Sequence, residues 1–158
     1  MDQGEFKIEM RPIGFVSRTS SDEDSLDRSL VSRIVLDQGL APALDGIQDY
    51  SHVFVIYWLD KITEADRLIL HFPGDPVGIL ATRVPKRPNP IGLSLVELVR
   101  HEGNILWVKS LDAFDGTPIL DIKPYPEWVH GQPIVVTDFR VPAWLSGPRV
   151  IERVDAAG

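Results

Sequence analysis

Short runs of β-branched and aromatic residues, each followed by turn formers, constrain the fold of this chain more than any other feature. The runs have the length of single strands and read IGFVS, SRIVL, HVFVIYWL, VGILATRV, LSLVELV, ILWVKSL and PILDIKPY. Between them stand the turn-forming stretches DQG, PGDP, HEGN and DGTP. Regular strand spacing without alternating helices is typical of a barrel or a sandwich and not of a Rossmann fold. We therefore predict an all-β fold, a single small antiparallel β-barrel with short helical turns.

Three local patterns refine this prediction. Residues 96–110 form the clearest hairpin, with Gly103 and Asn104 as turn residues between two alternating strands. Residues 43–50 and 64–70 are the only stretches that favour a helical turn. Residues 51–60, SHVFVIYWLD, are apolar along nearly their whole length, which predicts a strand buried on both faces.

The size and composition fit one soluble domain. The chain has 158 residues, 44% of them apolar, and no run of about 18 apolar residues that would span a bilayer. The start MDQGEFKIEM is too charged for a signal peptide, so we expect a cytoplasmic protein that does not associate with membranes. We predict one domain over residues 1–158, with about the last 15 residues as a tail.

Residue types limit the chemistry. The chain has no cysteine, which excludes disulfides, thiolate catalysis and cysteine-ligated zinc. Its four histidines show no metal-ligand spacing, so we predict no metal; they are His52, His71, His101 and His130. The net charge of −7 argues against a broadly basic surface that coats nucleic acid, but it does not forbid a local cationic patch.

Residues 82–94, TRVPKRPNPIGLS, combine stiffness with positive charge. Proline fixes φ and holds the preceding residue extended, so this stretch cannot be helical and is predicted to be a rigid loop with outward-pointing side chains. It carries Arg83, Lys86 and Arg87 without any acidic residue. Polar side chains on a rigid backbone suit a binding site, whereas the alternative is an ordinary connection with solvated charges.

A second unusual segment is LDAFDGTPILDIKPY, residues 111–125. Asp115 and Gly116 predict a turn, after which strand alternation puts Asp121, Lys123 and Tyr125 on one face. A carboxylate, an ammonium and a phenol would then line one surface; the alternative is an exposed strand face with a cross-bonded Asp and Lys. The chain has no Ser/His/Asp triad, P-loop or glycine-rich dinucleotide motif in either segment.

The ends of the apolar run 51–60 also carry polar residues. His52 begins the run and is either a hydrogen-bonded core or rim histidine or a catalytic group. Asp60 ends it and would either meet a ligand's hydroxyl or ammonium or be a solvated strand end.

With these segments in view, the chain resembles the TrmO family, also called YaeB-like or TsaA-like. The matching stretches are IGFV, LDGIQDYSHVFVIYWL, ATR-x-P-x-RPNPIGLSLVEL and DGTPILDIKPY. The resemblance implies a single-sheeted β-barrel that works as a homodimer and uses S-adenosylmethionine near the subunit interface. It also implies N6-methylation of threonylcarbamoyladenosine at position 37 of tRNA, next to the anticodon.

Matched position by position, the resemblance implies cofactor contacts at the residues Leu59, Asp60, Arg83, Leu93, Asp115, Gly116, Thr117 and Pro118. The chain departs from the family where Leu59-Asp60 replaces Phe-His, where Val84 replaces a common Ser, and where SSDEDSLDRSLVS replaces a Pro-Arg-Gln-type segment.

Chemical reasoning adds the remaining roles. Methyl transfer needs alignment and a proton acceptor, and Asp121 is the first candidate for the acceptor, with Lys123 and Tyr125 positioning the substrate. Lys86 and Arg87 are expected to contact phosphate or the tRNA anticodon loop. Asn89 would pair with an adenine edge or brace the loop. Two alternatives stay open: a methyltransferase for a small metabolite, and a sensor domain that binds S-adenosylmethionine without catalysis.

Overall fold

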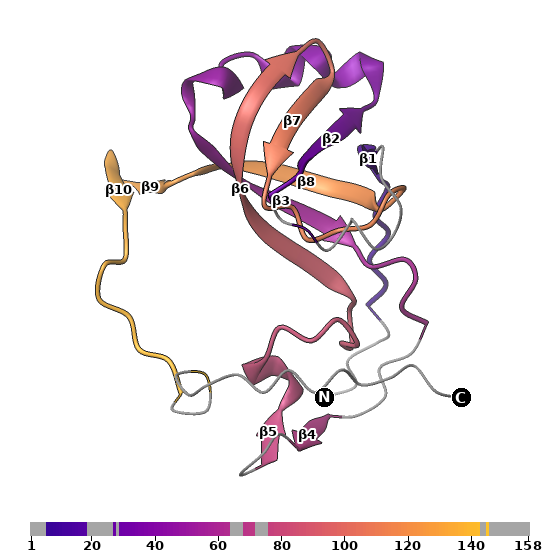
Figure 1. The fold of residues 1–158 in the computed structure, drawn as a ribbon, viewed down its shortest axis with the longest axis vertical. Coiled ribbons are helices and arrows are strands. Elements are labelled where there is room, and N and C mark those ends of the chain that lie inside the picture. Colours follow the sequence, from indigo (N-terminus) through magenta and orange to yellow (C-terminus); the bar gives the residue numbers. More distant parts are fainter. Residues whose placement is uncertain are drawn as a thin grey trace.

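A closed six-stranded barrel forms the body of the molecule in a computed structural model that describes residues 6–18, 27, 29–63, 68–71, 76–142 and 145 (Figure 1). The strands run in the order β1-β2-β7-β6-β3-β8, and each pairs antiparallel with its neighbours. They are β1 (Gly14–Ser17), β2 (Val31–Leu36), β3 (His52–Trp58), β6 (Ile91–Glu102), β7 (Ile105–Lys109) and β8 (Pro118–Tyr125). The predicted all-β antiparallel barrel is therefore confirmed.

Alternate residues of the strands fill the barrel interior, because successive side chains of a strand point to opposite faces. Every barrel strand contributes at least one apolar side chain to this core, and the fully enclosed ones are Ile34, Val53, Val55, Val96, Leu106, Val108 and Ile119. Burial of this apolar surface is the main stabilising contribution to the fold.

Strand β3 corrects one expectation. Val53, Val55 and Tyr57 are buried, but the alternating residues between them, including Phe54 and Ile56, are only half-buried. The prediction that both faces are buried was wrong, because a single closed sheet encloses only one interior and leaves its other face outside. An unbroken apolar run indicates two buried faces only where other layers cover both sides of the sheet.

Short elements surround the barrel. The 3-10 helices η2 (Gln38–Leu44) and η3 (Ile47–Asp49) lie over one end of it, where Leu44 joins the core (Figure 1). A hairpin of β4 (Ile69–His71) and β5 (Pro76–Gly78) stands apart from the barrel, followed by η4 (Ile79–Ala81). A second hairpin consists of β9 (Glu127–Val129) and β10 (Gln132–Ile134).

Two elements agree with the sequence patterns. The predicted hairpin over residues 96–110 is β6 and β7, with Gly103 at φ 57° in its turn. Asn104 follows and ties the turn to β2, since its Nδ2 donates to the Leu36 carbonyl at 2.6 Å. The helical turns expected over residues 43–50 are the end of η2 and η3.

Two other elements differ from the sequence patterns. The run VGILATRV was expected to be a strand, but only Pro76–Gly78 pairs, with β4, and the chain then turns through η4. Pro85, Pro88 and Pro90 have no backbone N–H to donate to a ladder, and the chain joins the sheet again only where β6 begins at Ile91. In residues 64–70 a helical turn was expected, yet Ile69 and Leu70 are in β4, and residues 64–67 lie outside the described part.

Two features are absent from the described part of the chain. No helix among these residues is long and apolar enough to cross a membrane. Within the same described ranges, no group of three or more His, Cys, Asp or Glu side chains is arranged to hold a metal ion. The expected tail, about the last 15 residues, falls outside the described residues except for Leu145.

Candidate functional site

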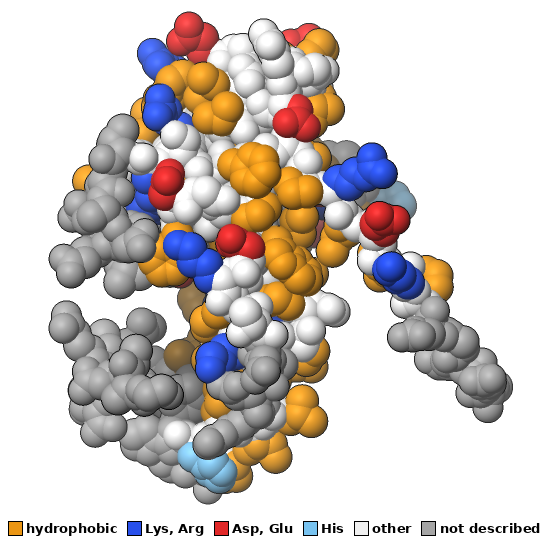
Figure 2. All heavy atoms as spheres, turned by 90° about the vertical axis from the view of Figure 1, so that its right-hand side faces the viewer, with side chains coloured by type: hydrophobic (Ala, Val, Ile, Leu, Met, Phe, Trp, Pro, Cys, Tyr) orange, Lys and Arg blue, Asp and Glu red, His pale blue; other side chains and the backbone are white. Residues whose placement is uncertain are grey.

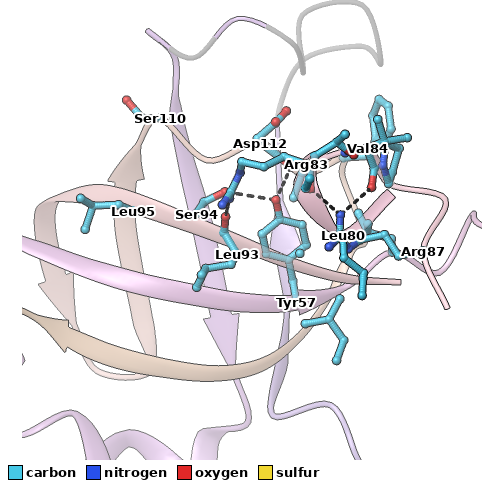
Figure 3. A pocket seen from close by; sticks show the side chains of 18 residues that line it. Tyr57, Leu80, Arg83, Val84, Arg87, Leu93, Ser94, Leu95, Ser110 and Asp112 are labelled. Atoms are coloured by element: carbon cyan, nitrogen blue, oxygen red, sulfur yellow. Dashed lines mark hydrogen bonds between the residues drawn. The ribbon is translucent and has the colours of Figure 1, made fainter. Parts of the chain in front are cut away.

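A cavity of about 1130 Å³ opens at the end of the barrel opposite η2 and η3 (Figure 3). Strand β3 ends there, β6 begins there and β7 ends there, because neighbouring strands are antiparallel. The walls are formed by residues 80–85, 87, 91–95, 110 and 112–114, together with Tyr57 and Leu59. Pockets for small ligands are commonly about 300–1,000 Å³, so this cavity is large enough for a nucleoside with a further substituent.

The proline-rich loop forms one wall, and arginines fix its shape. Arg87 Nη1 donates to the Thr82 carbonyl at 2.7 Å and lies 3.4 Å from the carbonyls of Ile79 and Val84. Arg83 Nη2 donates to the Leu93 carbonyl and so ties the loop to β6. Prolines limit φ and guanidinium groups cross-link carbonyls, so two devices constrain the shape of the loop. The expectation of outward-pointing side chains was wrong for Arg83 and Arg87, because their guanidinium groups turn back onto backbone carbonyls.

Buried hydroxyl groups form the floor of the cavity. Tyr57 Oη lies 3.1 Å from Ser94 Oγ and donates to the Asp112 carbonyl at 2.7 Å. Gly92 makes this possible, since a Cβ there would lie 2.0 Å from Tyr57 Cε2. Sequence analysis missed Tyr57, Ser94 and Asp112; a glycine and a serine at inward positions of an apolar strand were the available signal.

The third wall is the loop after β7. Ser110 has φ 69°, an unusual value for a residue other than glycine. Arg18 holds the loop in place, because its Nη2 donates to the Leu111 carbonyl at 2.6 Å and its backbone N–H to Asp115 Oδ1 at 2.7 Å. Burial lowers the pKa of Arg18, and the nearby carboxylates of Asp112 and Asp115 oppose that shift.

Phe114 adds an aromatic rim to this wall. It is 37% exposed, and Lys61 Nζ lies 4.8 Å from its ring centroid. An exposed ring at the mouth of a cavity offers a surface on which a nucleobase can stack.

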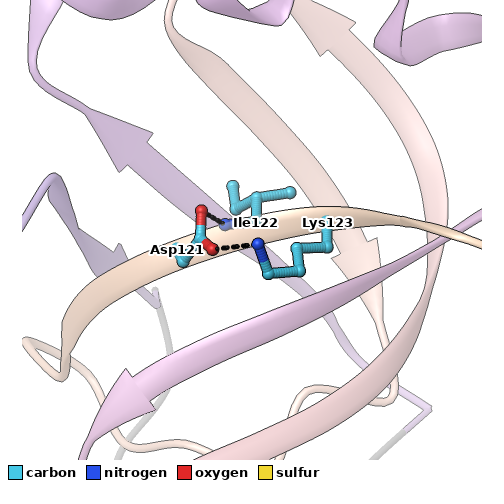
Figure 4. A network of polar contacts seen from close by, with 3 residues as sticks. All are labelled: Asp121, Ile122 and Lys123. Carbon is cyan, nitrogen blue, oxygen red and sulfur yellow. Dashed lines mark hydrogen bonds and ion pairs between the residues drawn. The ribbon is translucent and has the colours of Figure 1, made fainter.

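The predicted acid–base residues lie elsewhere, on the outer face of β8 (Figure 4). Lys123 Nζ is 2.8 Å from Asp121 Oδ2, while Asp121 Oδ1 accepts the Ile122 backbone N–H at 2.9 Å. The hydrogen bond to Asp121 raises the pKa of Lys123. Tyr125 packs its ring edge-on against Phe54 with centroids 5.6 Å apart. As expected, Asp121 and Lys123 share one face, but neither they nor Tyr125 line the cavity.

The other predicted site residues divide into two groups. Those that line the cavity are Leu59, Arg83, Arg87 and Leu93. Those that do not are Asp60, Lys86, Asn89, Asp115, Gly116, Thr117 and Pro118. The turn 115–118 instead supports the adjoining wall, since the Gly116 N–H donates to the Val16 carbonyl at 2.9 Å. His52 bonds Ser51 Oγ through Nδ1 at 2.9 Å and lies across from Tyr125 in the sheet.

The chain is thus a closed antiparallel β-barrel with a loop-walled candidate ligand cavity at one end. Residues 20–130 match the model of the tRNA-methyltransferase O N-terminal domain, and the chain belongs to this family. The match spans most of the barrel and all of the cavity walls.

Similar proteins agree with that assignment. The chain is 42% identical over 130 residues to a probable S-adenosyl-L-methionine-binding protein of Methanothermobacter thermautotrophicus, covering 78% of this chain and 93% of the relative. It is 38% identical over 87 residues to a mouse tRNA (adenine(37)-N6)-methyltransferase, covering 52% of this chain and 20% of the mouse protein. The crystal structure of TrmO from Pseudomonas aeruginosa superposes with a TM-score of 0.70 at 26% identity, over 90% of this chain and 64% of that one.

Proposed function

We propose that the protein is an S-adenosylmethionine-dependent methyltransferase that methylates N6 of threonylcarbamoyladenosine at position 37 of tRNA. The observation that carries the proposal is the cavity at the barrel end, in a chain of this family. One wall of the cavity is held by the hydrogen bond from Arg83 to the Leu93 carbonyl. The archaeal and mouse relatives support the methyl donor and the tRNA substrate respectively.

The cavity residues fit a ligand with an adenosine and an amino-acid part. Leu80, Leu93, Leu95 and Phe114 offer apolar or aromatic surface for a base. Polar groups lie beside these side chains. Arg83 would bind a carboxylate of the ligand, and carbonyl oxygens would accept hydrogen bonds from an ammonium or an exocyclic amine. Leu59, Arg83 and Leu93 would contact the methyl donor directly, with Asp60 and residues 115–118 closing the site around it.

Bound S-adenosylmethionine supplies an electrophilic methyl group on a sulfonium. In the transfer, the bond between sulfur and methyl breaks with its electron pair going to sulfur, a nitrogen–methyl bond forms, and N6 loses a proton. The chain must align the nucleophile and receive that proton. Asp121 is the proposed acceptor, and Lys123 and Tyr125 position the substrate.

Because these three residues do not line the cavity of their own chain, we propose a homodimer in which one protomer's Asp121 serves the partner's cavity. Lys86 and Arg87 contact the tRNA anticodon loop, and Asn89 braces the loop or pairs with a base edge. Arg87 would do so with guanidinium nitrogens other than Nη1, which bonds the loop carbonyls.

The deciding experiment incubates the protein with S-adenosylmethionine labelled in its methyl group and with tRNA that carries or lacks threonylcarbamoyl. Label in the modified tRNA alone, recovered as the N6-methylated nucleoside, is the expected result. Calorimetry should show S-adenosylmethionine binding that is unchanged by chelator, because no metal takes part. Binding that requires added divalent ions would contradict this.

One observation favours a second candidate, a methyltransferase for a small metabolite. The net charge is −7, and on the face in Figure 2 acidic side chains lie among the Lys and Arg side chains. Label found in extract metabolites, with none in tRNA, would identify this activity. Binding without transfer to either would indicate a sensor domain.

A further inference from the structure

The hydrogen bonds at the cavity floor have a defined direction. Tyr57 is 4% exposed and Ser94 is 8% exposed, so both hydroxyls are largely withdrawn from solvent. Tyr57 Oη lies 2.7 Å from the Asp112 carbonyl oxygen and 3.1 Å from Ser94 Oγ (Figure 3). A phenol has one hydrogen, and a carbonyl oxygen can only accept.

The direction of the second bond follows from the first. Since Tyr57 donates its hydrogen to the Asp112 carbonyl, its oxygen must accept in the contact with Ser94. Ser94 therefore donates its own hydrogen to Tyr57. Ser94 lines the cavity, so its oxygen faces the cavity with its lone pairs and can accept a hydrogen bond there.

The surroundings keep this arrangement fixed. The Tyr57 ring packs directly on Gly92, which lies opposite it in the β3–β6 ladder. The Asp112 carbonyl belongs to a loop that Arg18 holds through the neighbouring Leu111 carbonyl at 2.6 Å. The Tyr57 ring is therefore held against β6, and its hydroxyl keeps its contacts with Ser94 and the Asp112 carbonyl.

We infer that Ser94 Oγ, held as a hydrogen-bond acceptor by Tyr57, recognises an N–H donor of the ligand in the cavity. The inference rests on the proposed function, which supplies two such donors: the 6-amino group of adenine and the ammonium of the amino-acid part. A buried acceptor facing a ligand without a matching donor stays unpaired, and this lowers affinity about 10-fold or more.

Calorimetry on the full chain with three probes tests the inference. S-Adenosylhomocysteine carries both donors, S-inosylhomocysteine has an oxygen in place of the 6-amino group, and 5′-methylthioadenosine lacks the amino-acid part. Ser94→Ala should lower the affinity for S-adenosylhomocysteine about 10-fold. Ser32→Ala is the matched control, because Ser32 is a 1% exposed serine on β2 that does not line the cavity, and it should change no affinity.

The probes identify which donor is recognised. If it is the adenine amine, S-inosylhomocysteine binds the unmodified protein about 10-fold more weakly than S-adenosylhomocysteine, and Ser94→Ala removes most of that difference. If it is the ammonium, the two bind alike, and Ser94→Ala leaves 5′-methylthioadenosine unaffected. Either result supports the inference.

Tyr57→Phe separates a directional role from a structural one. The ring that packs on Gly92 is retained, but Ser94 loses its acceptor and can turn its hydrogen to the cavity. The ratio of affinities for the probes with and without the recognised donor should therefore fall toward one. Unchanged affinities in both Ser94→Ala and Tyr57→Phe would overturn the inference while leaving the proposed function intact. No binding of S-adenosylhomocysteine to the unmodified protein would overturn the proposed function itself, and the inference with it.

Discussion

At Gly92 the barrel brings strand β6 and the ring of Tyr57 so close together that no side chain fits between them. A Cβ at this position would meet three ring atoms of Tyr57 at 2.0–2.5 Å. The absent side chain thus gives the ring its place at the cavity floor, from which its hydroxyl reaches Ser94 and Asp112. Both the packing of the barrel end and the affinity for a ligand therefore depend on Gly92.

We predict that Gly92→Ala lowers the free energy of unfolding by about 1–3 kcal/mol, because an added methyl group must displace the Tyr57 ring. Urea denaturation measures the stability change, and calorimetry should show a parallel loss of S-adenosylmethionine affinity. Gly78→Ala is the matched control: a Cβ there would meet no atom within 4 Å beyond its chain neighbours, and its φ is −64°. That variant should be unchanged or about 0.4–1 kcal/mol more stable. Equal destabilisation of both would show that the ring contact is unimportant.

Asp121 governs the titration of Lys123, since its hydrogen bond is the largest cause of the raised pKa of that ammonium. Asp121→Asn should lower the Lys123 pKa toward its usual 10.5, which NMR of the labelled lysine side chain can follow. Because the pKa of Lys123 is raised in the folded state, the ion pair stabilises the fold while Asp121 is ionised, and this stabilisation is lost as the pH rises above 10.5 through the folded value. Neutral pH therefore leaves the pair intact.

The same variant tests the proposed proton acceptor. Asn is nearly the size of Asp but a far weaker base, so turnover should fall while S-adenosylmethionine affinity stays nearly unchanged. Glu102→Gln is the control, because Glu102 pairs with Arg100 at 3.7 Å on another strand. Normal turnover in Asp121→Asn would move the role to Tyr125, His52 or solvent.

Among the elements, the loop before β6 is held in shape by prolines and by arginine hydrogen bonds, and only the prolines can be recognised from the sequence. Its prolines are visible in the sequence and predict rigidity. Its arginine cross-links are not, because they depend on where the carbonyls of residues 79, 82 and 84 come to lie in the folded loop. Arg87 was expected to face tRNA, and the structure shows its Nη1 bonding the loop itself.

Lys86 and Arg87, two of the three cations of this loop, should therefore behave differently when replaced by alanine. Arg87→Ala should weaken S-adenosylmethionine binding, because the cavity wall loses its brace. Lys86→Ala should leave that affinity unchanged and reduce the logarithmic salt slope of tRNA binding by about one unit. Calorimetry and filter binding at several salt concentrations measure the two effects. If Arg87→Ala alters only tRNA binding, its phosphate role outweighs its bracing role.

Elements with a clear alternation of apolar and polar residues could be predicted from the sequence, and elements without it could not. Strands with clear alternation, such as β6 and β7, and the turn at Gly103 could be predicted from local residues alone. The β4–β5 hairpin could not, because short segments become strands only where a partner lies beside them. Tyr57 and Ser94 escaped notice for a related reason: they are 37 residues apart, and only the β3–β6 register brings them together.

For the whole molecule, the two groups of proposed site residues lie on different surfaces. The cavity is at the barrel end, and Asp121, Lys123 and Tyr125 are on the outside of β8. Exposed apolar side chains outside the cavity are available to bury against a second copy; among the described residues they include Phe6, Ile8, Phe15 and Ile69. Figure 2 shows hydrophobic side chains gathered on one face of the molecule.

A subunit-mixing experiment tests the proposed shared site. Arg83→Ala and Asp121→Asn should each reduce methyl transfer when pure. Mixed dimers should recover part of the activity, because one of their two sites combines an intact cavity with an intact Asp121 from the other protomer. Sedimentation at micromolar concentration should show a dimer throughout. A fully active monomer, or mixtures without any recovery, would contradict the shared site.

The closure of the barrel has a consequence for how the chain reaches its fold. Strands β1 and β8 close it through only two residue pairs, Gly14 with Ile119 and Phe15 with Pro118, whereas β3 and β6 share seven. Bringing residues so distant in sequence together costs loop entropy that few contacts repay at this seam, so it should form last and open first. Amide protons along β1 should accordingly exchange with solvent before those of β3 and β6. During synthesis the barrel cannot close until β8 has left the ribosome. Until then the apolar side chains on the inner faces of the earlier strands stay exposed to solvent.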